Sequence, residues 1–74
     1  MTHYNDNYLL KHFSKTLRHK LIEKGITQKQ LAEQIGSGQT TISRYVNAQG
    51  LPNYYTLYSL SKALNCSVDD FFPK

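Results

Sequence analysis

Residues 27–45 read TQKQLAEQIGSGQTTISRY, and this stretch decides the fold. It opens with a threonine followed three positions later by a glutamine, Thr27 and Gln30. This is the capping-box pattern, in which each side chain pairs with an amide that the first turn of a helix leaves unpaired. Gly36 then predicts the end of the helix, because glycine readily adopts the left-handed backbone of a sharp turn. The stretch therefore begins with a short helix and a tight turn.

A second short helix is expected over about residues 39–47, with either Ser37 or Gly38 as its cap. Ala32 lies in the first of the two helices, where its small side chain lets them cross closely. The apolar wedge between them is formed by Leu31, Ile35 and Ile42. Two short helices joined by a glycine turn make a helix-turn-helix motif, here over about residues 27–47.

The rest of the chain also has a helical pattern. A long first helix is expected from about Asn7 to Lys24, with Gly25 as its left-handed end. A fourth helix begins after Asn53 and a short fifth one after Ser67, since both are good caps. No segment alternates apolar and polar residues as a strand does, so we expect an all-α fold with five helices. The apolar stripe of the first helix comprises Leu10, Phe13, Leu17 and Leu21.

The chain has 74 residues and a formal net charge of +4. This length suits a single domain, residues 1–74, with residues 1–6 as a loose N-terminal arm. The charge is uneven, because residues 1–50 hold seven basic and three acidic residues whereas residues 51–74 hold two of each. Such an excess fits an anionic partner, although lysines on a helix can also simply be solvated.

Several classes of protein are excluded by what the sequence lacks. Cys66 is the only cysteine, so there is no intramolecular disulfide, and we expect it to pack as a small apolar residue. His3, His12 and His19 lack convergent ligand partners, so we expect no metal and no cofactor. Nothing resembles a nucleophile–base pair or a phosphate-binding glycine loop, so we expect no catalytic site and no enzyme. No membrane span or signal peptide is present, which predicts a soluble cytoplasmic protein without a membrane partner.

The outward face of the second short helix carries hydrogen-bonding residues and no acid. These residues are Gln39, Thr40, Ser43 and Arg44. Glutamine and arginine can make paired contacts to adenine and guanine edges in the major groove of DNA. Arg44 is either an ordinary surface arginine or a base reader, and its place beside Gln39 and Thr40 favours base reading.

The sequence resembles the Cro and phage-repressor (Xre-type) family of helix-turn-helix regulators over about residues 13–72. The matching blocks are residues 27–36, Thr41-Ile42-Ser43-Arg44-Tyr45, Pro52, Thr56-Leu57, Leu60, Lys62-Ala63-Leu64 and Ser67-Val68-Asp69-Asp70-Phe71-Phe72. The resemblance implies a five-helix, lambda-repressor-like DNA-binding domain of bacterial or phage origin. The sequence departs from the family near Val46 and Ala48, where the family often has glutamate and then glycine.

The resemblance also implies roles for matching residues in binding double-stranded DNA. Base edges are expected to be read by Gln39, Thr40, Ser43 and Arg44. Phosphates are expected to be contacted by Gln28, Lys29, Thr41, Asn53, Tyr54 and Tyr55, with Thr41 alternatively touching its own helix. A homodimer would form through Phe71 and Phe72. The implied function is a repressor that binds an inverted-repeat operator as a dimer through the major groove.

Some alternatives stay open. Tyr54, Tyr55 and Tyr58 form a cluster that fills the core, makes a dimer patch or donates to phosphates. Tyr45 is expected in the core rather than stacked on a base. A different class of function is a protein-interaction module on the same fold, such as an antitoxin or an anti-repressor that sequesters a protein partner. A third option, a restriction–modification controller, is again a DNA-binding protein.

Overall fold

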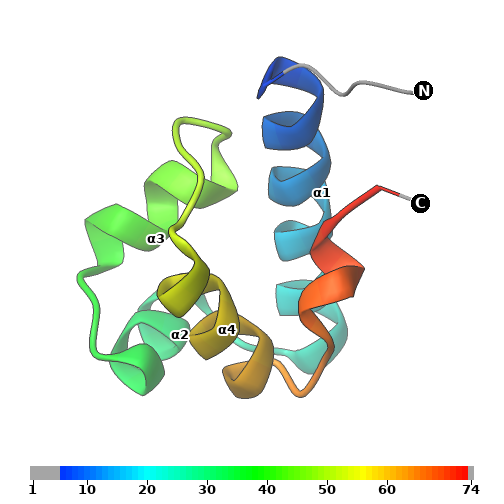
Figure 1. Cartoon of the computed structure of the whole chain (residues 1–74). Coiled ribbons are helices and arrows are strands. Elements are labelled where there is room, and N and C mark those ends of the chain that lie inside the picture. The colour runs from blue at the N-terminus through cyan, green and yellow to red at the C-terminus, as the bar shows by residue number, and fades with distance from the viewer. Residues whose placement is uncertain (1–5, 74) are drawn as a thin grey trace.

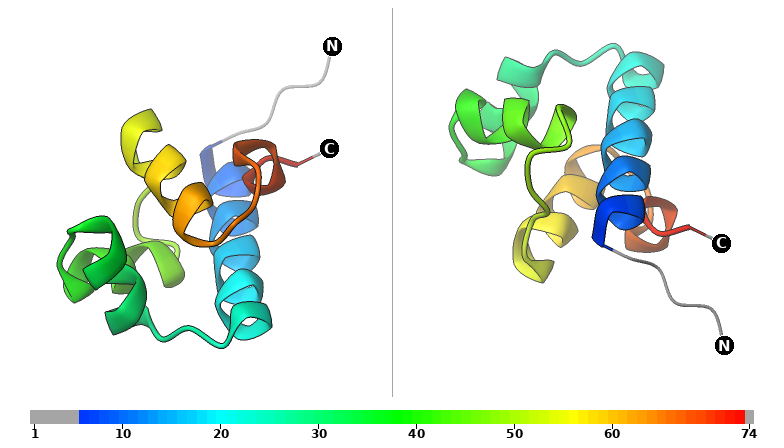
Figure 2. Two further views of the ribbon diagram at one scale, coloured as in Figure 1. Left: turned by 90° about the horizontal axis from the view of Figure 1, so that it is seen from below. Right: turned by 90° about the horizontal axis from the view of Figure 1, so that it is seen from above.

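The computed structural model describes residues 6–73, which form four α-helices and one short 3-10 helix, with no strand among them (Figure 1). The elements are α1 (Asp6–Lys24), α2 (Gln28–Ile35), α3 (Gln39–Val46), α4 (Tyr54–Ala63) and the 3-10 helix η1 (Val68–Phe71). In all three views of Figures 1 and 2, α3 and η1 lie at opposite sides of the molecule. The all-α class is therefore confirmed.

The prediction of a fifth α-helix is wrong, because residues 68–71 form a single 3-10 turn. Ser67 does cap this turn, and its hydroxyl oxygen accepts from the Asp69 amide at 3.2 Å. The turn ends at Phe72, whose backbone is extended at φ −106° and ψ 144°. Extended backbone is what steric crowding imposes on a residue that precedes proline, here Pro73. The helix consequently stops after one turn.

The helix α1 begins at Asp6, which the sequence assigns to the N-terminal arm. The rest of that predicted arm, residues 1–5, lies outside the described residues. Although α1 has 19 residues, no helix within residues 6–73 is both long and apolar enough to cross a membrane.

The core is built from the apolar faces of all five elements. The predicted stripe of α1 is confirmed at Phe13, Leu17 and Leu21, whereas Leu10 is only half-buried. Tyr45 packs partly buried against this core, as predicted, with its ring centroid 5.9 Å from that of Phe13 in an edge-on arrangement. The largest fully buried apolar side chains are Phe71, Leu17, Leu31, Ile42, Leu60 and Leu64.

The turn between α2 and α3 follows from local capping. Thr27 and Gln30 form the predicted capping box, with nitrogen–oxygen distances of 2.9 and 3.0 Å. Gly36 has a φ of +70°, in the left-handed region where glycine is favoured. The amide of Ser37 then donates to the Ala32 carbonyl at 2.8 Å. These bonds fix the direction in which the chain leaves α2 and enters α3.

The start of α3 shows which of the two candidate caps is used. The cap is Gly38, with extended backbone and no side-chain hydrogen bond. A glycine cap is only a few tenths of a kcal/mol weaker than a hydroxyl cap. The first amides of α3 therefore have no side-chain cap.

Candidate nucleic-acid interface

The four predicted base-reading residues share one outward face of α3. Gln39, Thr40 and Arg44 are exposed, and Ser43 is half-buried. The opposite face is anchored in the core by Ile42, which is fully buried. Since α3 contains no acidic residue, no side chain on the helix itself repels an anionic partner. The structure thus presents one polar, acid-free face.

Asn47 extends this face just beyond α3 and was not among the predicted residues. Its side-chain amide donates to the Ser43 carbonyl at 2.9 Å and lies 3.3 Å from the Ser43 hydroxyl oxygen. The Ser43 hydroxyl accepts in this contact, so its own proton remains available to an outside partner. The signal for Asn47 was present in the sequence as two polar residues four positions apart on a helix.

Thr41 lies at the edge of the polar face rather than at its centre. It is half-buried, and its amide donates to the Gly38 carbonyl at 3.1 Å. Together with Arg44, Gly50 and Leu51 it lines a cavity of about 190 Å³. Thr41 and Arg44 therefore border the loop that follows α3.

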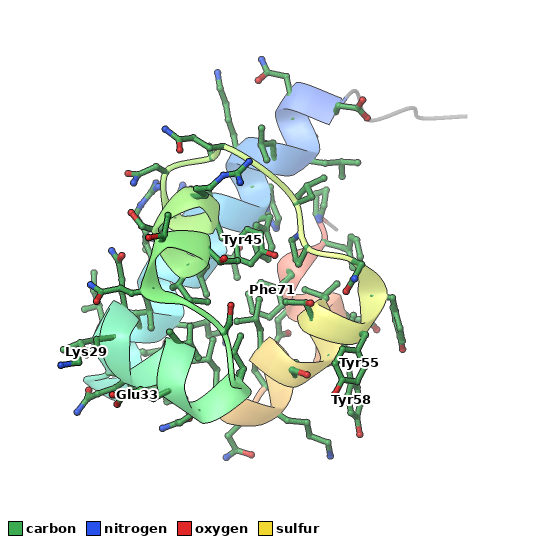
Figure 3. The ribbon with its side chains drawn as sticks, turned by 90° about the vertical axis from the view of Figure 1, so that its left-hand side faces the viewer. Lys29, Glu33, Tyr45, Tyr55, Tyr58 and Phe71 are labelled. Carbon is green, nitrogen blue, oxygen red and sulfur yellow. The ribbon has the colours of Figure 1, made fainter. Side chains whose placement is uncertain are left out.

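The start of α2 presents the first two predicted phosphate contacts, Gln28 and Lys29. Gln28 is half-buried, and Lys29 is exposed and points outward from the helix (Figure 3). The Thr27 side chain caps the Gln30 amide, and the amides of Gln28 and Lys29 have no partner within the helix. Free amides at a helix start suit an anion such as a phosphate.

Asn53, another predicted phosphate contact, is partly committed within the chain. Its side-chain oxygen accepts from the Thr56 amide at 2.8 Å and so caps α4, as the sequence predicts. The side-chain NH2 group of Asn53 is what remains for an outside partner.

The tyrosines of α4 lie on the surface. Tyr54 and Tyr55 are 72% and 78% exposed, and Tyr58 is 46% exposed. Figure 3 shows Tyr55 and Tyr58 pointing away from the core. The Lys62 ammonium group lies 5.5 Å from the centroid of the Tyr58 ring. The core-filling interpretation of this cluster is therefore wrong. A dimer patch and donation to phosphates remain as predictions.

A long acid-free segment contains both α3 and α4. No Asp or Glu occurs between Glu33 and Asp69, whereas Arg44 and Lys62 lie within that interval. A surface with positive charges and no acid attracts polyanions such as DNA. The acid-free part of the chain therefore includes α3, the loop that follows it and α4.

The two phenylalanines assigned to a dimer surface occupy different environments. Phe71 is 1% exposed, and its ring centroid lies 5.4 Å from that of Phe13. A side chain this buried in its own chain is not free to form an intermolecular surface, so the assignment of Phe71 is wrong, whereas that of Phe72 stays a prediction. Phe72 is exposed and lines a small apolar cavity of about 90 Å³ together with Leu51 and Pro52.

The carboxyl end of α3 is held by two side chains of α1 that the sequence did not single out. The Ser14 hydroxyl donates to the Val46 carbonyl at 2.6 Å. Arg18 Nη1 donates to the same carbonyl at 2.8 Å and to the Ser14 hydroxyl oxygen at 2.8 Å. The sequence signal was a serine and an arginine four positions apart, beside the apolar stripe of α1.

The remaining chemistry-bearing groups are separate from this surface. Cys66 is half-buried and packs against the core, as predicted, and burial raises the pKa of its thiol. The nearby Lys20 ammonium group opposes this rise. Within residues 6–73, no three His, Cys, Asp or Glu side chains are arranged to hold a metal ion.

Two short helices joined by a glycine turn, the second with a polar, acid-free face, define a helix-turn-helix domain. The helix-turn-helix family matches residues 17–71, most of the chain. The chain therefore belongs to the helix-turn-helix family of the Cro/C1 (Xre) type, a family of DNA-binding transcription regulators. The family resemblance seen in the sequence is thus confirmed.

Two known proteins are similar to this chain. The HTH-type transcriptional activator BcrR from Enterococcus faecalis is 34% identical over 58 residues, which cover 78% of this chain and 28% of that protein. The match thus spans little more than a quarter of the length of this relative. The crystal structure of the hypothetical transcription factor NHTF from Neisseria matches with a TM-score of 0.84 and 18% identity. That match covers 99% of this chain and 84% of the other, and at this identity it shows the fold alone.

Proposed function

We propose that this chain acts as a single domain that binds double-stranded DNA in a sequence-specific manner, with α3 in the major groove. The observation that carries the proposal is the outward face of α3, where Gln39, Thr40, Ser43 and Arg44 stand together without an acid. Such side chains match the hydrogen-bonding pattern of base edges. The starts of α2 and α4 would contact the flanking phosphates and so fix the register on the duplex.

The proposal includes a homodimer on an inverted-repeat operator. One small domain buries only about 600–1,000 Å² on DNA, which limits its specificity. Two copies related by a twofold axis read half-sites about one duplex turn apart, ~34 Å. Phe72 and Leu51 are 46% and 47% exposed and border one apolar cavity, which supports a contact surface at this end of the molecule.

The proposed effect on transcription is repression, because a protein that occupies an operator excludes other proteins without needing a further contact. The similar BcrR protein is named an activator, and the match covers 28% of it. Transcription from a promoter carrying the operator decides between the two signs. Repression predicts less transcript when the protein is added, and more transcript would contradict it.

DNA binding is tested by titrating the protein against a duplex with a preferred site and against a scrambled duplex at several salt concentrations. Affinity for both duplexes is expected to fall steeply between about 50 and 200 mM salt. Protein binding releases cations from the DNA phosphates, and this release is less favourable at higher salt. The preferred duplex is expected to bind at least about 10³-fold more tightly than the scrambled one. Equal affinity for the two duplexes would contradict sequence-specific binding.

A second candidate function is capture of a protein partner, as by an antitoxin or an anti-repressor. The exposed side chains of Tyr54, Tyr55 and Tyr58 favour it, because aromatic residues are enriched in protein interfaces. Binding through these rings would survive high salt and would be lost in the Tyr55→Ala and Tyr58→Ala variants. If those variants abolish partner binding while DNA affinity in the wild type is negligible, this function replaces the first.

A further inference from the structure

The carbonyl groups at the end of α3 are satisfied in two different ways. Those of residues 43–45 accept from backbone amides of the following loop at 2.8 to 3.3 Å. The Val46 carbonyl accepts instead from the side chains of Ser14 and Arg18, at 2.6 and 2.8 Å. Both donors belong to α1, 32 and 28 positions earlier in the sequence. The end of α3 is therefore fastened to another helix.

The attachment is a connected network that runs from the buried Ser14 to Arg18, an exposed residue whose hydrogen bonds are partly buried. Ser14 is 1% exposed, and its hydroxyl donates to Val46 while accepting from Arg18. Hydrogen bonds from a charged donor are about twice as strong as neutral ones, and a positive charge at the carboxyl end of a helix complements its dipole. Among the described residues no carboxylate pairs with Arg18, so its hydrogen bonds go to this network.

The length of α3 explains why its direction matters for DNA reading. The helix has 8 residues, which corresponds to a length of about 12 Å. A tilt of about 10° at Val46 would therefore move Gln39, at the other end, by roughly 2 Å. A hydrogen bond lengthened by that much is lost. Discrimination between bases requires α3 to keep its direction.

We propose that Arg18 and Ser14 are positioning residues for α3, which act through the Val46 carbonyl on the discrimination between DNA sequences. The inference rests on the proposed function, because it concerns how α3 reads DNA. In this account neither side chain contacts DNA. Their effect appears in the ratio of affinities for preferred and scrambled duplexes rather than in overall affinity.

The test measures this ratio at one salt concentration, together with the melting temperature, for four variants. Arg18→Gln and Ser14→Ala are each expected to lower the ratio about tenfold, since each removes a hydrogen bond to the Val46 carbonyl, buried for Ser14 and partly buried for Arg18. Arg18→Lys keeps the charge and a donor nitrogen but loses the forked guanidinium group, and it is expected to retain part of the ratio. The matched control is Lys15→Gln, which removes an exposed charge from α1. It should weaken binding to both duplexes alike and leave the ratio unchanged.

Two results would overturn the proposal. An unchanged ratio in both Arg18→Gln and Ser14→Ala, with only the melting temperature lowered, would make the network purely stabilising. An equal loss of affinity for both duplexes in Arg18→Gln, larger than in Lys15→Gln, would make Arg18 a phosphate contact. If Arg18→Gln does not fold, Ser14→Ala decides alone, because it keeps the bond from Arg18. Failure of the proposed function would show in the wild type as a ratio near one, whereas failure of the positioning leaves that ratio high.

Discussion

The ring of Phe71 lies 5.4 Å from the ring of Phe13, so the last turn of the described chain is packed on α1. An ion pair between Lys20 and Asp70, 3.6 Å apart, joins the same two elements at the surface. The Asp70 side chain is 38% exposed, and exposed ion pairs contribute little to stability. The aromatic contact is therefore the main attachment of η1 to α1.

Phe71 and Phe72 are expected to respond differently to substitution by alanine. Phe71→Ala removes a buried ring from the core and should lower the free energy of unfolding by about 3–5 kcal/mol. Phe72→Ala should change it by about 0.5 kcal/mol or less, since the side chain is half open to solvent. Urea denaturation measures both values. Sedimentation equilibrium should show a weaker dimer in Phe72→Ala, and an unaltered dimer would remove Phe72 from the contact surface.

Arg44 and Lys29 are expected to contribute to DNA binding in different ways. Arg44→Ala should cost about 1–3 kcal/mol on the preferred duplex and relax its sequence preference. Lys29→Gln should weaken binding to preferred and scrambled duplexes equally. It should also reduce the slope of log affinity against log salt concentration by about one. Fluorescence anisotropy with both duplexes gives all of these values. If neither substitution alters binding to any duplex, the DNA surface lies elsewhere.

The loop after α3 contains a strained residue that can be relieved. Ala48 has a φ of +58°, in the left-handed region that costs a non-glycine residue about 1–2 kcal/mol. Ala48→Gly removes this strain but adds chain entropy to the unfolded state, so we expect a net gain of up to about 1 kcal/mol. Thermal and urea unfolding check this gain. A loss of stability would mean that the loop does not have this backbone conformation.

Gly36→Ala provides the opposite case for comparison. Its φ is +70°, and a Cβ added there would meet no atom within 4 Å. The expected loss, about 1 kcal/mol, therefore comes from backbone strain alone and not from a clash. A Gly36→Ala variant with the same free energy of unfolding as the wild type would contradict the predicted strain at the turn.

The thiol of Cys66 should react slowly in the folded chain. Burial raises its pKa above the ordinary value of 9.0, and the thiolate is the reactive form. Alkylation by iodoacetamide at pH 8 is therefore expected to be slower in the folded chain than in urea. The unfolded chain loses this proton first, so the contribution to stability is complete below pH 9.0 and is lost as the pH rises toward the folded pKa. The difference in the pH dependence of unfolding free energy between the wild type and Cys66→Ala isolates this contribution. Equal alkylation rates in the folded chain and in urea would contradict burial of the thiol.

The features that the sequence predicted correctly depend on near neighbours in the chain. The capping box of Thr27 and Gln30 and the left-handed Gly36 each involve residues within one helical turn, where local chemistry decides the backbone. The polar face of α3 was predictable for the same reason, because helical periodicity alone determines which residues share a face.

The features that were missed depend on packing between distant segments. Periodicity does not decide which of two adjacent phenylalanines faces α1, so the burial of Phe71 could not be assigned. The network at Val46 joins residues 32 positions apart, and its donors looked like ordinary members of a basic helix. The fifth helix was predicted to begin after the Ser67 cap, but the extended backbone that Pro73 imposes on Phe72 leaves only a single 3-10 turn before it.

The central claim is that this chain reads DNA sequence through α3. The most direct test is to select bound duplexes from a pool of random sequence with the purified protein and to repeat the selection with Arg44→Ala. We expect the wild type to enrich an inverted repeat whose half-sites lie about 10 base pairs apart from centre to centre, or a multiple of that spacing. The variant should lose a base preference at the same position in each half. A pool that shows no enriched sequence, or an identical enriched site for both proteins, would contradict the claim.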